Sequence, residues 1–342
     1  MNWERRWHPL LSQWVIVAAH RQDRPWSGEL VGDASGAPPP EHDPSCHLCP
    51  GARRVGGQMN PGYTGPWAFD NDRPSLGADA PTDLAGATGL YRRAPATGRT
   101  RVLCYTPRHD LSLARLPVAG VEAVVDAWRA EHRALAAMDG VESVLIFENR
   151  GEICGVSNPH AHGQIYATGF VYDAVERHLE AAARHRASTG RTLYADVLDA
   201  ETRDGARLVA ERERAVAFVP WFARYAYEVH VAPRRTVGDV AALDDAEARD
   251  LAAVLHEVLV RYDNLWRTDF PYLMTLQQAP VRSSHPDFHF HIQLHPPLRK
   301  PGLRKYLGAH EVGAGNFLAD TVPDDSAAAL RDTSLVHWRE AT

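Results

Sequence analysis

The chain has 342 residues, of which 44% are hydrophobic and 23% charged, and its formal net charge is -6. This length allows a substantial apolar core, so the four cysteines do not indicate a disulfide framework. No apolar run approaches the roughly 20 residues that cross a bilayer, and no long run of Lys and Arg marks a general nucleic-acid binder. We therefore expect an ordinary soluble globular protein that binds neither membranes nor nucleic acids.

The N-terminal segment carries basic and aromatic residues but no apolar stretch of signal-peptide length, which predicts a cytoplasmic protein. Residues 14–17 are the first β-type run. Arg21 and Arg24 follow it, at a spacing suited to clamping a diphosphate through forked donors. Taken alone, two arginines after a strand more often form a solvated turn.

Two segments, 30–45 and 76–98, are rich in Gly, Pro, Ala and Asp and are predicted to be loops. Between them, Cys46 and Cys49 form a C-x2-C pair, which brings two thiolates within tetrahedral reach of one zinc ion. The pair supplies only half a site, and a chance C-x2-C is the alternative. His109 is a plausible third ligand.

Further along the chain, residues 101–105 and 143–147 are β-type runs that, together with 14–17, are expected to form one antiparallel sheet. One-sided apolar periodicity predicts helices over residues 121–138, 174–187 and 244–266. Asn71-Asp72 and Asn149 are polar positions that indicate little by themselves.

The most informative motif is Ser-Asn-Pro-His-Ala-His-Gly-Gln at residues 157–164. Pro159 restricts the backbone to extended or turn conformations, so His160 and His162 should point to the same side. Gly163 would let a phosphate approach the backbone, while Gln164 and Ser157 offer hydrogen bonds to it. The motif predicts phosphoryl transfer through a phosphohistidine. One histidine of the pair could be the fourth zinc ligand, and the two could then divide the work, with His160 holding zinc and His162 free to attack. The alternative is an ordinary strand with two metal ligands or two hydrogen-bonded histidines.

The second half repeats the first in outline. A strand, a helix and a strand precede His160 and His162, and a strand and a helix likewise precede His289 and His291. This predicts an α+β fold of tandem duplicated units, each an antiparallel sheet with helices, over residues 1–170 and 171–342.

These motifs resemble those of the galactose-1-phosphate uridylyltransferases, a tandem branch of the histidine-triad superfamily. The resemblance runs nearly end to end, and its carriers are residues 9–14, 20–21, 24–26, 43–49, 60–65, 147–149, 157–164, 261–265, 295–299 and 303–306.

The resemblance implies specific roles. His162 would be the nucleophile, with Gln164 and Ser157 binding the transferred phosphoryl group. One zinc ion per chain would be held by Cys46, Cys49, His109 and His160. Asn71, Asp72 and Asn149 would contact uridine or ribose. Arg21, Arg24, Lys305 and Glu311 would reach a substrate, some of them across a homodimer interface.

The reaction that the resemblance implies is a double displacement. His162 would attack the α-phosphorus of UDP-glucose and release glucose 1-phosphate. Galactose 1-phosphate would then take the uridylyl group, giving UDP-galactose. Zinc would have a structural role.

The chain departs from the family pattern at a few positions. Gln277 and Gln293 stand where a second metal site of the family has histidines, so we expect one zinc and no second metal. His289 and His291 are then structural or line a substrate site. Ala161 replaces a usual proline, and Phe317 stands near where a glutamine usually contacts the hexose.

Two rival functions remain. The first is a nucleotidyltransferase or phosphorylase that uses adenine nucleotides or another sugar phosphate. The second is a zinc-stabilised nucleotide-binding module without turnover, which would have no need of a free nucleophilic imidazole.

Overall fold

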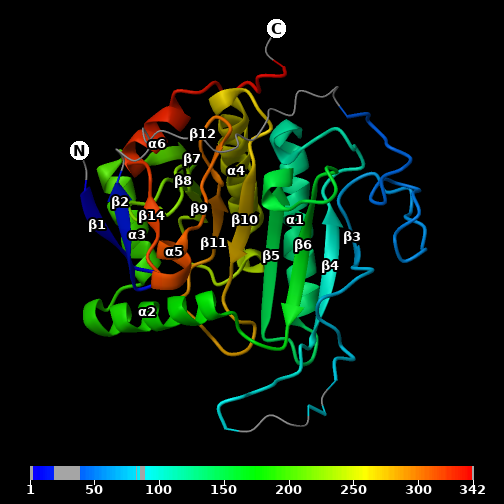
Figure 1. Ribbon diagram of the computed structural model, residues 1–342, viewed down its shortest axis with the longest axis horizontal. Helices are drawn as coiled ribbons and strands as arrows, with labels where there is room; N and C mark the ends of the chain where they lie inside the picture. Colours follow the sequence, from blue (N-terminus) through cyan, green and yellow to red (C-terminus); the bar gives the residue numbers. More distant parts are fainter. Residues whose placement is uncertain (1–2, 19–38, 82, 85–88, 341–342) are drawn as a thin grey trace.

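The computed structural model describes residues 3–18, 39–81, 83–84 and 89–340 (Figure 1). Arg21 and Arg24 lie outside these residues. No helix in the described ranges is both long enough and apolar enough to span a membrane. The helices are α1 Val118–Ala136, α2 Asp173–Thr189, α3 Leu193–Asp204, α4 Asp245–Trp266, α5 Ala309–Ala314 and α6 Pro323–Arg331.

In the described part of the chain, the largest sheet has nine strands, in the order β3-β4-β6-β5-β10-β11-β9-β8-β7, and every neighbouring pair is antiparallel. The first half contributes β3 Trp67–Asp70, β4 Gly98–Cys104, β5 Ser143–Arg150 and β6 His162–Thr168. The second half contributes β7 Leu208–Glu211, β8 Ala215–Phe218, β9 Val229–Pro233, β10 Tyr272–Gln277 and β11 His291–His295. The two predicted units therefore share one continuous sheet, joined where β5 pairs with β10.

Strand order supports the internal duplication. In the first half α1 connects β4 to β5, and in the second half α4 connects β9 to β10. The sheet runs β4-β6-β5 in one half and β10-β11-β9 in the other, so the two halves meet in mirror order. The fold class predicted from the sequence, a tandem α+β arrangement, is confirmed.

A small separate sheet contains the N-terminal hairpin. β1 Trp3–His8 pairs with β2 Gln13–Ala18, and β14 Leu318–Ala319 adds to β2 in parallel. The expectation that residues 14–17 belong to the same sheet as 101–105 and 143–147 was wrong, because the hairpin partner of β2 lies immediately before it in the chain. A short hairpin of β12 Leu298–Lys300 and β13 Leu303–Arg304 lies nearby in sequence.

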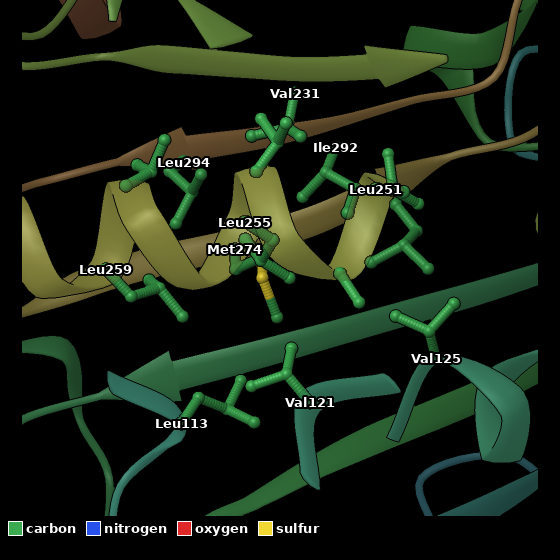
Figure 2. Packing of buried hydrophobic residues seen from close by; sticks show 14 of the residues in the cluster. Leu113, Val121, Val125, Val231, Leu251, Leu255, Leu259, Met274, Ile292 and Leu294 are labelled. Carbon is green, nitrogen blue, oxygen red and sulfur yellow. The ribbon is translucent and has the colours of Figure 1, made fainter. Parts of the chain in front are cut away.

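One face of the large sheet packs against α1 and α4, which also contact each other. The start of α4 is fixed by a capping box, in which the Asp244 side chain accepts from the Glu247 N–H and Glu247 accepts in return. Figure 2 shows side chains of the core between these helices and the sheet, with Leu251, Leu255 and Leu259 of α4 near Met274 and Ile292. This single apolar cluster draws on both halves of the chain.

The opposite face of the sheet is covered differently in the two halves. In the second half α2 and α3 pack on it through a cluster that includes Ala182, Tyr194, Val216 and Phe218. In the first half the covering is the segment around Cys46 and Cys49, over β3 and β4 only. The middle of the first-half face, where β6 and β5 lie, borders an open pocket.

Candidate active site and metal centre

Cys46, Cys49, His109 and His160 form a buried cluster whose ligand atoms all lie within 4.8 Å of one another. His160 Nδ1 is 3.8 Å from Cys46 Sγ and 3.5 Å from Cys49 Sγ, and His109 Nδ1 is 3.7 Å from Cys49 Sγ. A tetrahedral zinc site with Zn–S near 2.3 Å and Zn–N near 2.0 Å separates sulfur from nitrogen by roughly 3.5 Å. The donor set and its spacing therefore fit a tetrahedral metal ion.

The segment that carries the two cysteines is held by hydrogen bonds between its own side chains and its backbone. The Asp43 carboxylate accepts from the Ser45 N–H at 2.8 Å. Asn60 donates to the carbonyls of His47 and Cys49, both at 2.9 Å, and Tyr63 donates to the Leu48 carbonyl at 2.5 Å. We call residues 43–64 the cysteine loop. Its turns place both sulfurs toward His160.

His160 is oriented by the carbonyl of Thr106. Its Nε2 lies 2.8 Å from that oxygen, and because a carbonyl only accepts, Nε2 carries the proton. The other nitrogen, Nδ1, is then free to bind a metal ion, as in the common arrangement in which a backbone oxygen fixes the tautomer. Burial raises the pKa of the Cys49 thiol to about 11, so a cation beside it is needed to keep it as a thiolate near neutral pH.

His162 is oriented by the preceding histidine. Its Nδ1 lies 2.7 Å from the His160 carbonyl and must donate to it, which leaves Nε2 unprotonated and nucleophilic. Burial lowers the pKa of His162, which favours the neutral imidazole. The ring borders a pocket whose other lining residues are Phe147, Asn149, Gly155, Val156, Ser157 and Gln164.

Gln164 lies two residues after His162 on β6, so both side chains point to the same face of the sheet. Tyr166 donates its hydroxyl proton to Gln164 Oε1 at 3.3 Å, which orients the side-chain amide of Gln164. Ser157 adds a hydroxyl to the same pocket. The pocket thus combines a nucleophilic nitrogen with donors suited to phosphoryl oxygens.

The position of Gly163 differs from the expectation. A Cβ at this residue would lie 2.2 Å from the hydroxyl oxygen of Tyr105 and 3.1 Å from the Phe147 carbonyl. Glycine is thus required by the packing beneath the strand rather than by a phosphate above it.

The polar residues predicted to bind substrate lie in three places. Asn149 lines the pocket of His162. Asn71 and Asp72 follow β3, and the Asn71 N–H donates to the Thr100 carbonyl at 2.9 Å. Lys305 donates to the Leu318 carbonyl at 2.6 Å and lies 3.5 Å from Glu311, away from the lining of that pocket.

The second-half echo of the motif keeps its backbone geometry but is closed. His289 Nε2 lies 2.9 Å from the Pro233 carbonyl, and His291 Nδ1 lies 2.9 Å from the His289 carbonyl. Here, however, the Gln293 amide donates to His291 Nε2 at 3.0 Å, and the Tyr194 ring stacks on His291 with centroids 4.2 Å apart. His289 and His291 are fully buried.

Several site residues were not predicted from the sequence. Phe147, Gly155 and Val156 line the pocket but carry no reactive group that would single them out. Tyr166 could have been predicted from the sequence, because on an extended strand it points to the same face as His162 and Gln164.

Comparison with known proteins places these features in a family. Residues 1–171 match the family model described as the N-terminal domain of galactose-1-phosphate uridyl transferase, and residues 176–342 match its C-terminal domain. A galactose-1-phosphate uridylyltransferase of Haemophilus influenzae is 35% identical over 342 residues, covering 99% of this chain and 96% of the relative.

Solved structures agree with the sequence relatives. A uridylyltransferase structure superposes with a TM-score of 0.78 at 28% identity, covering 96% of this chain and 97% of the other. An ADP-glucose phosphorylase from Arabidopsis thaliana gives a TM-score of 0.79 at 21% identity, covering 98% of this chain and 100% of the other, which shows a shared fold.

Proposed function

The chain belongs to the galactose-1-phosphate uridylyltransferase family, and from this membership and its site we propose that it exchanges uridylyl groups between UDP-glucose and galactose 1-phosphate. The observation that carries the proposal is the tautomer of His162. With Nδ1–H fixed on the His160 carbonyl, the lone pair of Nε2 is available in a pocket lined by Gln164 and Ser157.

The first step is attack of His162 Nε2 on the α-phosphorus of UDP-glucose. A P–N bond forms, the P–O bond to glucose 1-phosphate breaks, and the leaving oxygen takes the bonding electron pair. Phosphate monoesters have a second pKa of about 6, so glucose 1-phosphate leaves as a dianion without needing a proton. The uridylyl group then remains on His162.

The second step reverses the first with a different sugar. A phosphate oxygen of galactose 1-phosphate attacks the same phosphorus, the P–N bond breaks, and its electron pair returns to Nε2. The products are UDP-galactose and free His162. Because both steps pass through similar transition states, the same donors, Gln164 and Ser157, serve both.

The His160 carbonyl has a distinct role in this chemistry. Uridylylation of Nε2 makes the imidazole ring cationic while Nδ1 stays protonated, and a hydrogen bond to a carbonyl 2.7 Å away stabilises that charge. The carbonyl therefore orients the nucleophile and supports the intermediate.

We propose that the metal ion is zinc, held by Cys46, Cys49, His109 and His160. Two thiolates and two imidazoles are a donor set typical of closed structural zinc sites. Bound there, zinc would supply structural order. It would tie the cysteine loop to the strand that carries His162 through the adjacent His160.

For substrate recognition we propose that Asn149, Asn71 and Asp72 contact uridine or ribose. Arg21, Arg24, Lys305 and Glu311 are proposed to reach substrate phosphate or sugar. Since Lys305 and Glu311 do not line the pocket of His162 in the described chain, we propose that the enzyme is a homodimer, in which such residues complete the site of a second copy.

Isotope exchange tests the proposed function. A double displacement predicts that labelled glucose 1-phosphate exchanges into UDP-glucose with no galactose 1-phosphate present. His162→Asn should abolish this exchange while retaining its metal. A nucleotide-binding module would bind UDP-glucose without exchange.

The nucleotide preference is tested in the same assay. Exchange of label into ADP-glucose in place of UDP-glucose would identify the chain as an adenine-nucleotide enzyme and contradict the uridylyltransferase assignment.

A further inference from the structure

Arg54 is a buried cation inside the cysteine loop. Its side chain is only 9% exposed, yet among the described residues its Nε and Nη1 have no hydrogen-bond partner. The neighbouring Arg53 lies on the surface and donates to the Gly57 carbonyl at 3.0 Å. Buried donors without partners are rare in folded proteins. Arg54 therefore requires an explanation that Arg53 does not.

The guanidinium of Arg54 approaches two residues of the first half, Phe69 and Asp72. Its Cζ lies 4.4 Å from the ring centroid of Phe69, within the range of a cation–π contact. Its Nη2 lies 3.7 Å from Asp72 Oδ1. Phe69 belongs to β3 and Asp72 follows that strand, so Arg54 connects the cysteine loop to the end of β3.

The same loop approaches Asp72 a second time. A Cβ on Gly56 would lie 2.7 Å from Asp72 Oδ1 and 2.9 Å from its Cγ, so any larger residue would force this carboxylate to move. The Arg54 carbonyl accepts from the Gly57 N–H at 2.9 Å, and the Arg54 N–H donates to the Gln58 carbonyl at 2.8 Å, which fixes this turn. The Asp72 carboxylate thus approaches both Arg54 and Gly56.

Sheet register relates this contact to the nucleophile. Phe69 pairs with Val102, Val102 with Gln164, and Gln164 with Phe147, so these residues form one row across the sheet. Paired residues of antiparallel strands share a face. At about 4.8 Å per strand, the Phe69 backbone is roughly 10 Å from that of Gln164. This distance suits a nucleoside that spans from Asp72 to a phosphorus atom at His162.

We infer that Arg54 is a positioning residue, which fixes the Asp72 carboxylate for the ribose hydroxyls of the nucleotide and makes nucleotide binding depend on the folded cysteine loop. A carboxylate accepts from two neighbouring hydroxyls only if it is correctly turned, and the Arg54 guanidinium attracts Asp72 Oδ1 while the backbone at Gly56 packs against the same carboxylate. This inference rests on the proposed function, because its ligand is a uridine nucleotide.

The test measures binding of UDP-glucose by calorimetry to metal-loaded chains that also carry His162→Gly, so that no turnover occurs. Arg54→Met keeps an unbranched stem over Phe69 but removes the charge. It should weaken UDP-glucose binding about tenfold, the size expected for one contact of a charged group. The metal content and the affinity for galactose 1-phosphate should not change. Arg54→Lys keeps the positive charge but not the guanidinium group. Its affinity for UDP-glucose should lie between those of the parent and of Arg54→Met.

Two comparisons make the test specific. Arg53→Met removes the same charge from the same loop and should bind UDP-glucose like the parent. In a chain carrying Asp72→Asn, Arg54→Met should add little further loss, because the two residues act through one contact.

Three results would overturn the inference. One is UDP-glucose binding by Arg54→Met within about twofold of the parent, well inside the loss expected for a charged contact. The second is a loss of UDP-glucose affinity on Arg54→Met that is as large in a chain carrying Asp72→Asn as in a chain that keeps Asp72. The third is loss of metal in both Arg54→Met and Arg54→Lys, which would mean that Arg54 supports the loop itself. Failure of the parent chain to bind UDP-glucose would instead contradict the proposed function.

Discussion

His160 and His162 are chemically distinguished by two backbone carbonyls. The Thr106 oxygen takes the Nε2 proton of His160 and leaves Nδ1 facing the sulfurs, whereas the His160 oxygen takes the Nδ1 proton of His162 and leaves Nε2 facing the pocket. The spacing of the two histidines predicted a shared face, and the carbonyls explain how residues two apart differ in role. Sequence patterns do not specify such tautomers.

Gly163 provides a test of how strictly this strand is positioned. Gly163→Ala would place a methyl group 2.2 Å from the Tyr105 hydroxyl oxygen and 3.1 Å from the Phe147 carbonyl, so the strand or the buried Tyr105 ring must shift. Overpacking of this kind costs about 1–3 kcal/mol, and a shift near 1 Å slows a positioned reaction about 100-fold. Urea unfolding and the rate of His162 labelling by UDP-glucose measure the two effects.

The matched control is Gly65→Ala, whose Cβ would meet no atom within 4 Å. It should leave both stability and labelling unchanged. Normal labelling by Gly163→Ala would show that the packing under β6 does not position the nucleophile.

At the scale of elements, the cysteine loop is the part of the site that a metal ion should order. The two sulfur ligands of the metal site belong to the cysteine loop, whereas its two histidine ligands belong to the segments that precede α1 and β6. Cys49→Ser should therefore lower the metal content and reduce the free energy of unfolding by several kcal/mol, since metal binding and folding are coupled. Elemental analysis and urea unfolding measure these changes.

Cys104→Ala is the control for this prediction. Cys104 is buried in the same apolar cluster but lies outside the ligand group. Its replacement should retain the metal. Equal metal loss in both variants would contradict the assignment of the ligands.

The buried histidines beside α2 and β11 predict a loss of stability in mild acid. Burial lowers the pKa of His178 and His295 to about 3 and that of His289 to about 4. In the unfolded chain these groups titrate near 6.5. Between about pH 6.5 and pH 4 the unfolded chain thus binds more protons, and the free energy of unfolding falls as the pH falls. Each such histidine contributes up to about 1.4 kcal/mol per pH unit.

His178→Phe isolates one of these contributions. The His178 ring packs on Phe288 with centroids 4.4 Å apart, and its Nε2 has no hydrogen-bond partner in the described chain, so an aromatic ring can replace it. Urea midpoints at pH 7.5 and pH 5.5 should differ less for the variant than for the parent. If the urea midpoint shifted equally with pH in the parent and in His178→Phe, His178 would not be a source of the acid sensitivity.

Element prediction from the sequence succeeded where periodicity was strong. The helices expected over 121–138, 174–187 and 244–266 correspond to α1, α2 and α4. The assignment of residues 14–17 to the large sheet failed, because strand propensity does not identify the pairing partner. The short strand β3 and the helix α3 were missed for want of a distinct pattern.

At the scale of the whole molecule, the duplicated units differ mainly in what covers the outer face of the sheet. Helices α2 and α3 cover the second half of this face, where Tyr194 stacks on the His291 ring and Gln293 donates to its Nε2. The first half leaves His162 beside an open pocket. The sequence showed the repeat and the two histidine motifs. It did not show which one was accessible, because that depends on packing between distant segments.

The shared sheet predicts that the two halves do not fold independently. A fragment of residues 1–170 would expose the edge of β5 that pairs with β10 and would lose the α4 side of the core. We expect this fragment to aggregate. We expect the whole chain to unfold in a single urea transition, with the same midpoint by circular dichroism and by tryptophan fluorescence. A soluble, cooperatively folded fragment would refute the idea of one common core.

The central claim, transfer of a uridylyl group through His162, is tested most directly by trapping the intermediate. The metal-loaded enzyme is mixed with UDP-glucose, quenched within one turnover at mildly alkaline pH, where phosphohistidine survives, and digested for mass spectrometry. The account predicts a uridylyl group on His162 that disappears when galactose 1-phosphate is added. A modification of another residue, or a UDP-galactose product formed without any modified His162, would contradict it.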